Sequence, residues 1–96
     1  MRIYISGKIT GESNYKELFD EAEKLLEEQG HEVINPAKLD QIYPGFEWED
    51  YMQIDMALLR ICDAVYMLKN WIHSKGATIE HEYAQQIKRK IFYEAD

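Results

Sequence analysis

Strand-like and helix-like segments alternate along the whole chain, and this alternation constrains the fold more than any other feature. Short runs rich in β-branched, aromatic and other apolar residues predict strands over residues 2–6, 31–35, 63–68 and 91–96. Apolar residues at helical spacing predict helices over residues 14–30, 48–62 and 75–90. The order predicts an α/β fold, with a four-stranded parallel sheet, right-handed crossovers and helices on both faces.

The ends of the predicted helices carry their own signals. Ser13 and Ser74 have the side-chain type that caps a helix N-terminus, and Gly30 is a typical helix stop. The basic run 88–90 is placed at the C-terminal end of the last helix, where cations suit the helix dipole.

Composition excludes several classes of protein. The 96 residues predict one domain, 1–96, and an apolar fraction of 46% is typical of a folded globular chain. The formal charge of −7, with no basic stripe, argues against duplex nucleic acid as a partner. A lone cysteine, Cys62, fits a reducing compartment, and no apolar run is long enough to span a membrane. We therefore expect a cytoplasmic protein with no membrane contact.

Two glycine-bearing turns lie where a parallel sheet usually binds ligands, beyond the carboxyl ends of its strands. These turns are residues 6–11, "SGKITG", and residues 68–76, "LKNWIHSKG". Backbone donors, hydroxyl groups and Lys8 in the first turn suit an oxyanion. Its spacing matches neither the dinucleotide fingerprint nor the P-loop, and a plain strand-to-helix loop is the alternative.

Two carboxylates and a tyrosine are candidate functional groups. Asp55 falls inside the apolar stripe of its helix, where a carboxylate is costly unless it is paired or faces a polar cleft. A core aspartate that caps a nearby loop is the alternative. Glu80 lies at the edge of an apolar face and on pattern alone would be an ordinary solvated glutamate, while Tyr4 would be a core tyrosine.

No metal or cofactor is expected from the remaining polar residues. The three histidines, His31, His73 and His81, show no metal-ligand spacing, so a solvated role is predicted for each. Cys62 lies on an apolar helix face and is predicted to pack rather than react.

Taken together, three stretches resemble the nucleoside 2-deoxyribosyltransferase-like superfamily. They are "IYISGKITG", "YMQIDMALLRICDAVYML" with Asp55, and "SKGATIE" with Glu80. The chain is most similar to an uncharacterised, often phage-borne branch that carries W-x-D-Y-M-x-x-D and W-x-x-S-x-G-A-x-x-E. The resemblance covers residues 3 to about 93. It implies a small three-layer, flavodoxin- or Rossmann-like sandwich that forms a homodimer or larger homo-oligomer.

The resemblance also implies an activity and its catalytic residues. The substrate would be a nucleoside or nucleoside 5′-monophosphate, and the reaction would be cleavage of its N-glycosidic bond. Glu80 matches the nucleophilic glutamate that attacks C1′. Tyr4 matches the tyrosine that positions this nucleophile, and Asp55 matches an acid that contacts the sugar or assists departure of the base. The glycosyl-enzyme would pass its sugar to water or to a second base.

A 5′-phosphate site is implied in the two turns. Monophosphate hydrolases of this superfamily tend to have serine where this chain has Ser74, whereas transferases have aspartate. With Trp71 and Gly76, this turn would hold the phosphate together with the first loop, Gly7, Lys8, Ile9, Thr10 and Gly11. Thr10 stands where a hydrolase relative has arginine, and Lys8 would be a partial substitute.

Three functional hypotheses remain open from the sequence. The first is an N-glycosidase or deoxyribosyltransferase. The second is a protein that captures a nucleotide, or a nucleotide signal, in the same pocket without turnover. The third is an α/β domain that works through protein contacts, with residues 42–52, "IYPGFEWEDYM", as its interface.

Overall fold

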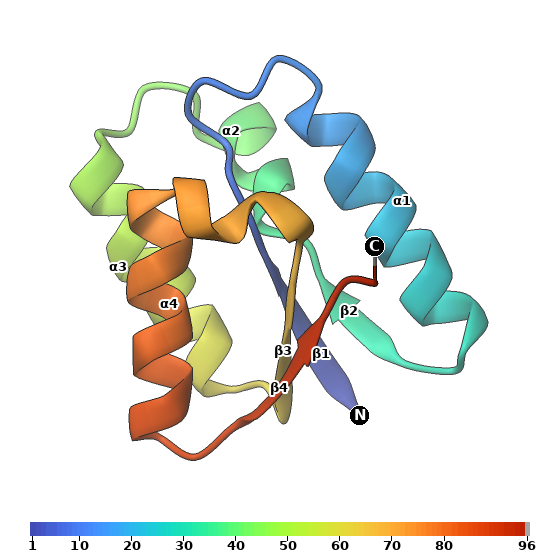
Figure 1. Cartoon of the computed structure of the whole chain (residues 1–96). Helices are drawn as coiled ribbons and strands as arrows, with labels where there is room; N and C mark the ends of the chain where they lie inside the picture. Colours follow the sequence, from blue (N-terminus) through green and yellow to red (C-terminus); the bar gives the residue numbers. More distant parts are fainter. Residues whose placement is uncertain (96) are drawn as a thin grey trace.

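The structure, a computed structural model, describes residues 1–95 without the side chains of residues 40 and 41. The strands are β1 (Arg2–Ser6), β2 (Glu32–Ile34), β3 (Ala64–Met67) and β4 (Lys90–Tyr93), and the α-helices are α1 (Tyr15–Glu28), α2 (Leu39–Ile42), α3 (Trp48–Arg60) and α4 (Lys75–Gln86). Two 3₁₀ turns, η1 (Pro36–Lys38) and η2 (Lys69–His73), complete the path in Figure 1. The predicted alternation is therefore confirmed, and α2 is an additional single turn.

Several elements are shorter than predicted; the predicted strand 91–96 ends at Tyr93, and residue 96 lies outside the described residues. Two of the predicted helix-end signals also differ. Helix α4 stops at Gln86, and Lys88 takes a positive φ of 60°, which turns the chain into β4. The basic run 88–90 therefore leads into β4 and does not continue the helix, but the Arg89 guanidinium still donates to the carbonyl of Ile87, the C-cap residue of α4, at 2.9 Å. Helix α1 starts after Asn14, which makes no side-chain cap, so Ser13 is not its N-cap. Gly30, with φ of 91°, follows the last turn of α1 as predicted.

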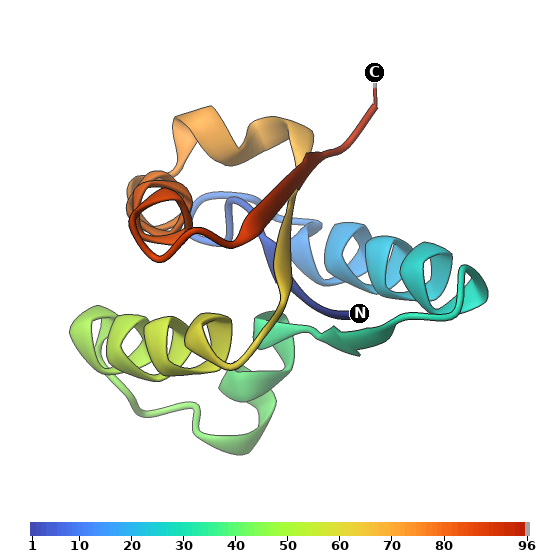
Figure 2. The same cartoon turned by 90° about the horizontal axis from the view of Figure 1, so that it is seen from below.

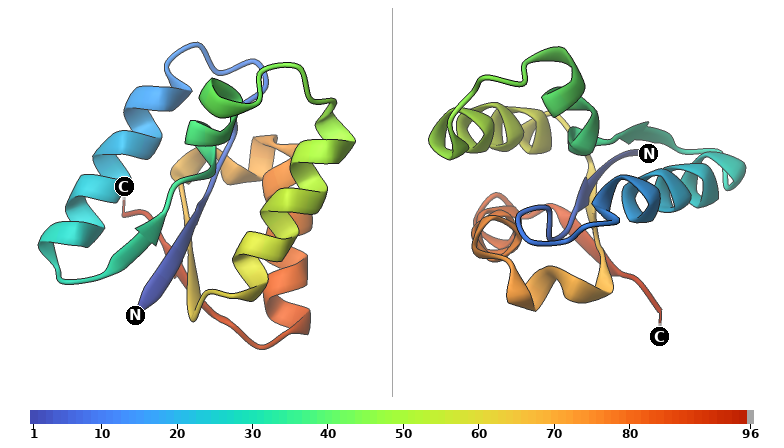
Figure 3. Two further views of the ribbon diagram at one scale, coloured as in Figure 1. Left: turned by 180° about the vertical axis from the view of Figure 1, so that it is seen from behind. Right: turned by 90° about the horizontal axis from the view of Figure 1, so that it is seen from above.

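All four strands are parallel, in the order β2-β1-β3-β4. The chain leaves β1 toward β2 on one side and leaves β3 toward β4 on the other. The carboxyl ends of β1 and β3 therefore border the point where the strand order reverses, which is where such sheets bind ligands. The β1–α1 loop, η2 and α2 lie at this same edge, as the views from behind and from above show (Figure 3).

Helices cover both faces of the sheet, giving the predicted three layers (Figure 2). Helix α1 covers one face, where Ile3 and Ile5 pack against Phe19. Helices α3 and α4 cover the other, where Tyr4 packs with Leu59. Successive side chains of a strand point to opposite faces, so Tyr4 and Ser6 both face α3 and α4. No helix within residues 1–95 is long and apolar enough to cross a membrane.

Candidate functional site

Glu80 is buried, with 4% of its surface exposed, and both of its carboxylate oxygens accept hydrogen bonds from β1. The Tyr4 hydroxyl donates to Oε2 at 2.6 Å, and the Ser6 hydroxyl donates to Oε1 at 2.6 Å. The two donors are two residues apart in β1, so they share one face of the strand, and this face packs against α4. The alternative of a solvated helical glutamate is therefore wrong.

Asp55 lies on α3 and is also buried, with 8% of its surface exposed. Its Oδ1 is fully buried and has no hydrogen-bond partner among the described residues. The pKa of Asp55 is raised to about 8, chiefly by burial and next by the nearby charge of Glu80, while the hydrogen bond with the Tyr4 hydroxyl lowers it. At neutral pH this carboxyl group is therefore mostly protonated.

Glu80 has the more acidic carboxyl group of the two. Its pKa is about 7, because burial raises it and the hydrogen bonds from Ser6 and then Tyr4 counteract part of that rise. Burial, followed by the charges of Glu80 and Asp55, raises the pKa of Tyr4 well above its usual value. Tyr4 therefore stays a neutral hydrogen-bond donor whenever Glu80 carries its charge.

A cavity of about 690 Å³ opens above these carboxyl groups at the carboxyl edge of the sheet. Its floor includes Tyr4, Asp55 and Glu80, and Trp48, Tyr51 and Met52 of α3 form one wall. The rest of its lining comes from the end of β1, the β1–α1 loop, α1, η1, the end of η2 and the start of α4: Ile5, Gly7, Ile9, Thr10, Phe19, Pro36, Ala37, His73, Ser74, Lys75, Gly76 and Ala77. Two carboxyl groups thus share an enclosure whose walls are largely apolar.

A family model described as "Domain of unknown function (DUF4406)" matches residues 1–93. The chain belongs to the DUF4406 family. A search of curated proteins found no match to it. The matched region runs from β1 through β4, so every residue that lines the cavity lies inside the DUF4406 domain.

This DUF4406 domain brings most of the sequence-predicted site residues together. Tyr4, Asp55 and Glu80 meet at the floor of the cavity. Of the residues predicted to hold phosphate, five lie on its rim: Gly7, Ile9, Thr10, Ser74 and Gly76. Ser74 also caps α4, because its hydroxyl accepts the backbone N–H of Ala77 at 3.1 Å. This N-cap was predicted from the sequence.

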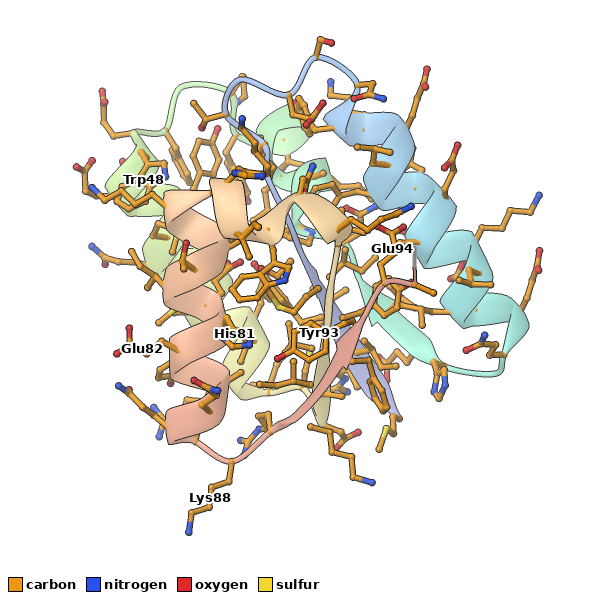
Figure 4. All side chains as sticks on the ribbon, viewed as in Figure 1. Trp48, His81, Glu82, Lys88, Tyr93 and Glu94 are labelled. Carbon is orange, nitrogen blue, oxygen red and sulfur yellow. The ribbon has the colours of Figure 1, made fainter. Side chains whose placement is uncertain are left out.

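Three predicted site residues do not line the cavity of the DUF4406 domain: Lys8, Gly11 and Trp71. The Lys8 side chain lies near Gly11 in its own loop, with Cε 3.8 Å from the place of a Gly11 Cβ. Trp71 stacks on His81, with ring centroids 4.2 Å apart. His81 in turn hydrogen-bonds the Tyr93 hydroxyl, and Figure 4 shows these two side chains pointing toward one another.

Asn70 ties the two turns of the rim together. Its side-chain Oδ1 accepts the backbone N–H of Lys8 at 3.0 Å, and its Nδ2 donates to Glu12 at 3.2 Å. One amide on η2 therefore holds both ends of the β1–α1 loop. The loop carries Ile9 and Thr10 to the cavity, whereas η2 leads into Ser74.

Two glycines on the rim lie in close packing, which requires glycine at Gly7 and leaves little room for a Cβ at Gly76. A Cβ on Gly7 would come within 2.6 Å of the buried Leu68 side chain. A Cβ on Gly76 would lie 3.1 Å from Met52 Sδ and 3.8 Å from Trp48 Nε1, so the starts of α3 and α4 approach closely there. Gly7 is thus explained by packing on Leu68, and both glycines border the cavity.

Sequence reasoning missed three features of the site. Ser6 was grouped with the oxyanion-binding turn, but its hydroxyl binds Glu80. Ser6 is two residues after Tyr4 in a strand, so both side chains point to the same face, and this spacing was the available signal that Ser6 faces the site. The α3 wall was not predicted, although Trp48, Met52 and Asp55 fall on one stripe of that helix. Lys75 was not assigned a role.

Chemically, the site offers one hydrogen-bonded carboxylate and one carboxylic acid in a shared cavity. Such a pair can supply a nucleophile and a proton at the same pH. Within the described part of the DUF4406 domain, no group of three or more His, Cys, Asp or Glu side chains could hold a metal ion.

Proposed function

We propose that this DUF4406 domain cleaves the N-glycosidic bond of a nucleoside or nucleoside 5′-monophosphate, as a hydrolase or a base-exchange transferase. One observation carries the proposal. Glu80 is buried at the floor of a cavity, is held by two hydroxyl groups, and shares that cavity with a second carboxyl group that has an unpartnered oxygen. The resemblance to the nucleoside 2-deoxyribosyltransferase-like superfamily supports the same activity.

In the first step, a carboxylate oxygen of Glu80 forms a bond to C1′ of the sugar. The bond between C1′ and the base nitrogen breaks, and its electron pair leaves with the base. Asp55 donates the proton or hydrogen bond that the departing base needs. In the second step, the oxygen of water or a nitrogen of another base bonds to C1′, the bond between C1′ and Glu80 breaks and restores the carboxylate, and Asp55, which gave up its proton in the first step, takes the proton of the attacking group, as in retaining glycosidases.

The pKa values support this division of roles between the carboxyl groups. Burial raises the pKa of both carboxyl groups, to about 7 for Glu80 and about 8 for Asp55. The two hydroxyl groups that donate to Glu80 favour its ionised form, whereas Asp55 Oδ1 has no such donor and the charge of Glu80 favours the protonated form of Asp55. Environments that separate two carboxyl pKa values commonly mark an acid and a nucleophile.

The size and lining of the cavity suit a nucleoside. Its volume of about 690 Å³ is within the usual range for small-molecule sites. Trp48 and Tyr51 present aromatic surface to a base, and the hydroxyl groups of Thr10 and Ser74 are polar contacts for a sugar or phosphate.

The alternative function is capture of a nucleotide without turnover. It is favoured by the fact that both Glu80 oxygens already accept hydrogen bonds, as expected of a buried structural carboxylate. A capture protein needs the cavity but not the nucleophile. Substituting Glu80 therefore separates the two functions.

The test is a release assay with nucleosides and 5′-monophosphates, ribo and deoxy, followed by chromatography for free base. We expect release by the wild type and a loss of at least about 10³-fold in Glu80→Gln. Glu82→Gln, an exposed carboxylate on the same helix, is the matched control and should retain activity. Ligand retention without release by the wild type would favour capture.

The resemblance also predicts a homodimer or larger homo-oligomer. Size-exclusion chromatography with light scattering measures this directly, and a monomeric mass would contradict it. Running the release assay over a range of protein concentrations tests whether assembly is needed for activity.

A further inference from the structure

Strand β4 forms an open edge of the sheet. It comes last in the order β2-β1-β3-β4, so within residues 1–95 it has a neighbouring strand on one side only (Figure 1). The backbone N–H groups of Lys90 and Glu94 donate to carbonyl oxygens at the two ends of β3, with N–O distances of 3.3 and 2.8 Å. Backbone groups alternate between the two sides of a strand, so those of Ile91 and Tyr93 point away from β3. They form a row of donors and acceptors with which a further strand can pair.

The opposite edge of the sheet, β2, has features that hinder such pairing. It has only three residues, and Pro36, which lacks a backbone N–H, follows two positions after it. Glu32 of β2 is held in an ion pair with Arg2 at 3.2 Å. By contrast, β4 has four residues, no proline and two exposed rings, Phe92 at 42% and Tyr93 at 55%. The edge that is open to pairing is therefore β4.

The sequence of β4 is complementary to itself in the antiparallel direction. A two-fold axis at Phe92 sets Ile91 of one copy opposite Tyr93 of the other, and Lys90 opposite Glu94. Ile91 and Tyr93 carry the outward backbone groups, so this register allows four hydrogen bonds between the copies. A shift by one residue would oppose outward groups to groups already bonded to β3. A shift by two would separate the lysine from the glutamate.

The two charges that this register brings together are unpaired within one chain. Neither Lys90 nor Glu94 forms an ion pair with another described residue. Oε1 of Glu94 accepts the backbone N–H of Lys69 at 2.9 Å, which holds this carboxylate at the end of β4, where Figure 4 labels it. Both charges share one face of the strand with Phe92, because each is two residues from it. A second copy thus offers each chain an opposite charge at both ends of the paired segment.

The same pairing covers apolar surface on both faces of the sheet. Phe92 is paired in register with Tyr66 and shares its face, the one that α1 covers farther along the sheet. Tyr93 lies on the other face, beside Trp71 and His81. With the two-fold axis perpendicular to the sheet, each face continues into the same face of the second copy. The Phe92 rings then meet each other, and Tyr93 meets Ile91 of the second copy.

We propose that β4 pairs antiparallel with β4 of a second copy about a two-fold axis at Phe92, joining two four-stranded sheets into one. No described residue of β4 lines the cavity, so this inference does not depend on the proposed function. It goes beyond the homo-oligomer expected from the resemblance, because it names the surface and the register. The paired segment is short, so we expect a Kd of about 10–100 µM at low salt.

A pair of variants at Tyr93 tests the backbone contact. Tyr93→Pro removes an outward N–H and leaves the hydrogen bonds to β3 in place, as proline is tolerated on an edge strand. Tyr93→Ala removes the same ring and keeps the N–H. Sedimentation velocity over a concentration series should give a dimer Kd at least about tenfold higher for the proline variant than for the alanine variant. Circular dichroism checks that both variants are folded.

A charge swap tests the register. Lys90→Glu and Glu94→Lys each place like charges opposite one another twice per dimer, so each should raise Kd at least about tenfold. The double variant restores opposite charges and should return Kd to within about threefold of the wild type. Lys24→Glu makes the same change of charge at an exposed position on α1 and should leave Kd unchanged.

Amide hydrogen exchange locates the contact directly. The amides of Ile91 and Tyr93 should exchange more slowly as protein concentration rises, whereas those of Lys90 and Glu94 are already bonded and should not change. The proposal is overturned if the wild type stays monomeric up to about 1 mM, well above the expected Kd, if the two Tyr93 variants dimerise alike, or if the charge swap does not restore pairing. An oligomer in which the Ile91 and Tyr93 amides stay unprotected would also overturn it, while leaving the homo-oligomer expected from the resemblance intact.

Discussion

Tyr4 donates a hydrogen bond of 2.6 Å to Glu80, which lies 76 residues later in the chain. The bond joins the first strand to the last helix inside a cavity that also contains Asp55. Because Ser6 binds the other Glu80 oxygen, the orientation of this carboxylate is fixed from one face of one strand.

Replacing Tyr4 with phenylalanine should raise the pKa of Glu80 above about 7, because the lost hydrogen bond favours the carboxylate. Carbon-13 NMR of the glutamate carboxyl groups measures this without any substrate. In an active enzyme the acid limb of kcat/KM should move to higher pH by the same amount. Tyr93→Phe, which removes a hydroxyl bonded to His81 outside the cavity, is the control. An unmoved Glu80 titration in Tyr4→Phe would contradict the role of Tyr4.

The stability of the protein should fall as the pH rises toward 8. The pKa of Asp55 goes from 3.8 in a free side chain to about 8 in the fold, so the folded state holds this proton more tightly. Binding of this proton stabilises the folded state fully below about pH 4, and this stabilisation is lost progressively as the pH rises from there through about 8. The free energy of unfolding should decrease by up to about 1.4 kcal/mol per pH unit for this group.

Asp55→Asn should reduce this decrease, because the amide does not titrate. Urea unfolding of the wild type and the variant at pH 5 and pH 8 measures the difference. Glu82→Gln, on the exposed side of α4, serves as the control for removing a carboxylate. Equal pH slopes in the wild type and Asp55→Asn would show that Asp55 does not keep its proton in the fold.

Gly7→Ala should destabilise the fold by about 1–3 kcal/mol, because the new Cβ would overlap Leu68 in a packed core. Gly45→Ala is the matched control, since nothing lies within 4 Å of the place where its Cβ would be. Urea midpoints of the two variants give the comparison. If both variants were as stable as the wild type, the close packing of Gly7 on Leu68 would be wrong.

Ser74→Ala should cost about 1 kcal/mol of stability, because it removes the side-chain cap of α4. Ser13→Ala changes the same residue type near the start of α1, where no side-chain cap exists, and should have little effect. Thermal unfolding of both variants at one pH distinguishes them. A larger loss in Ser13→Ala would contradict the observed capping.

The sequence predicted the order and type of the main elements because each carries its own local pattern of apolar residues. The alternating side chains of β1 pack on opposite faces of the sheet, and the predicted stripe on α3 lines the cavity together with Tyr4 of β1. The end of α4 was misplaced because residues 88–90 continue a helix-compatible composition, while the break is a single positive φ at Lys88.

Features that depend on contacts distant in sequence were harder to predict. Glu80 has an unremarkable helical position, and only the two hydroxyl groups of β1 show that it is buried and paired. Trp71 shares a motif with Ser74 and Glu80, yet it points to His81 and not into the cavity. Lys75 gave no signal because its partner Trp48 lies on another helix.

The Asn70 side chain, which binds the Lys8 amide and Glu12, has a consequence for motion. A local opening of the β1–α1 loop must break these bonds and so releases η2 as well. The two rims of the cavity should therefore fluctuate as one cooperative unit, with a shared opening free energy in amide hydrogen exchange. Entry of a ligand would then depend on a single gating event rather than on two independent loops.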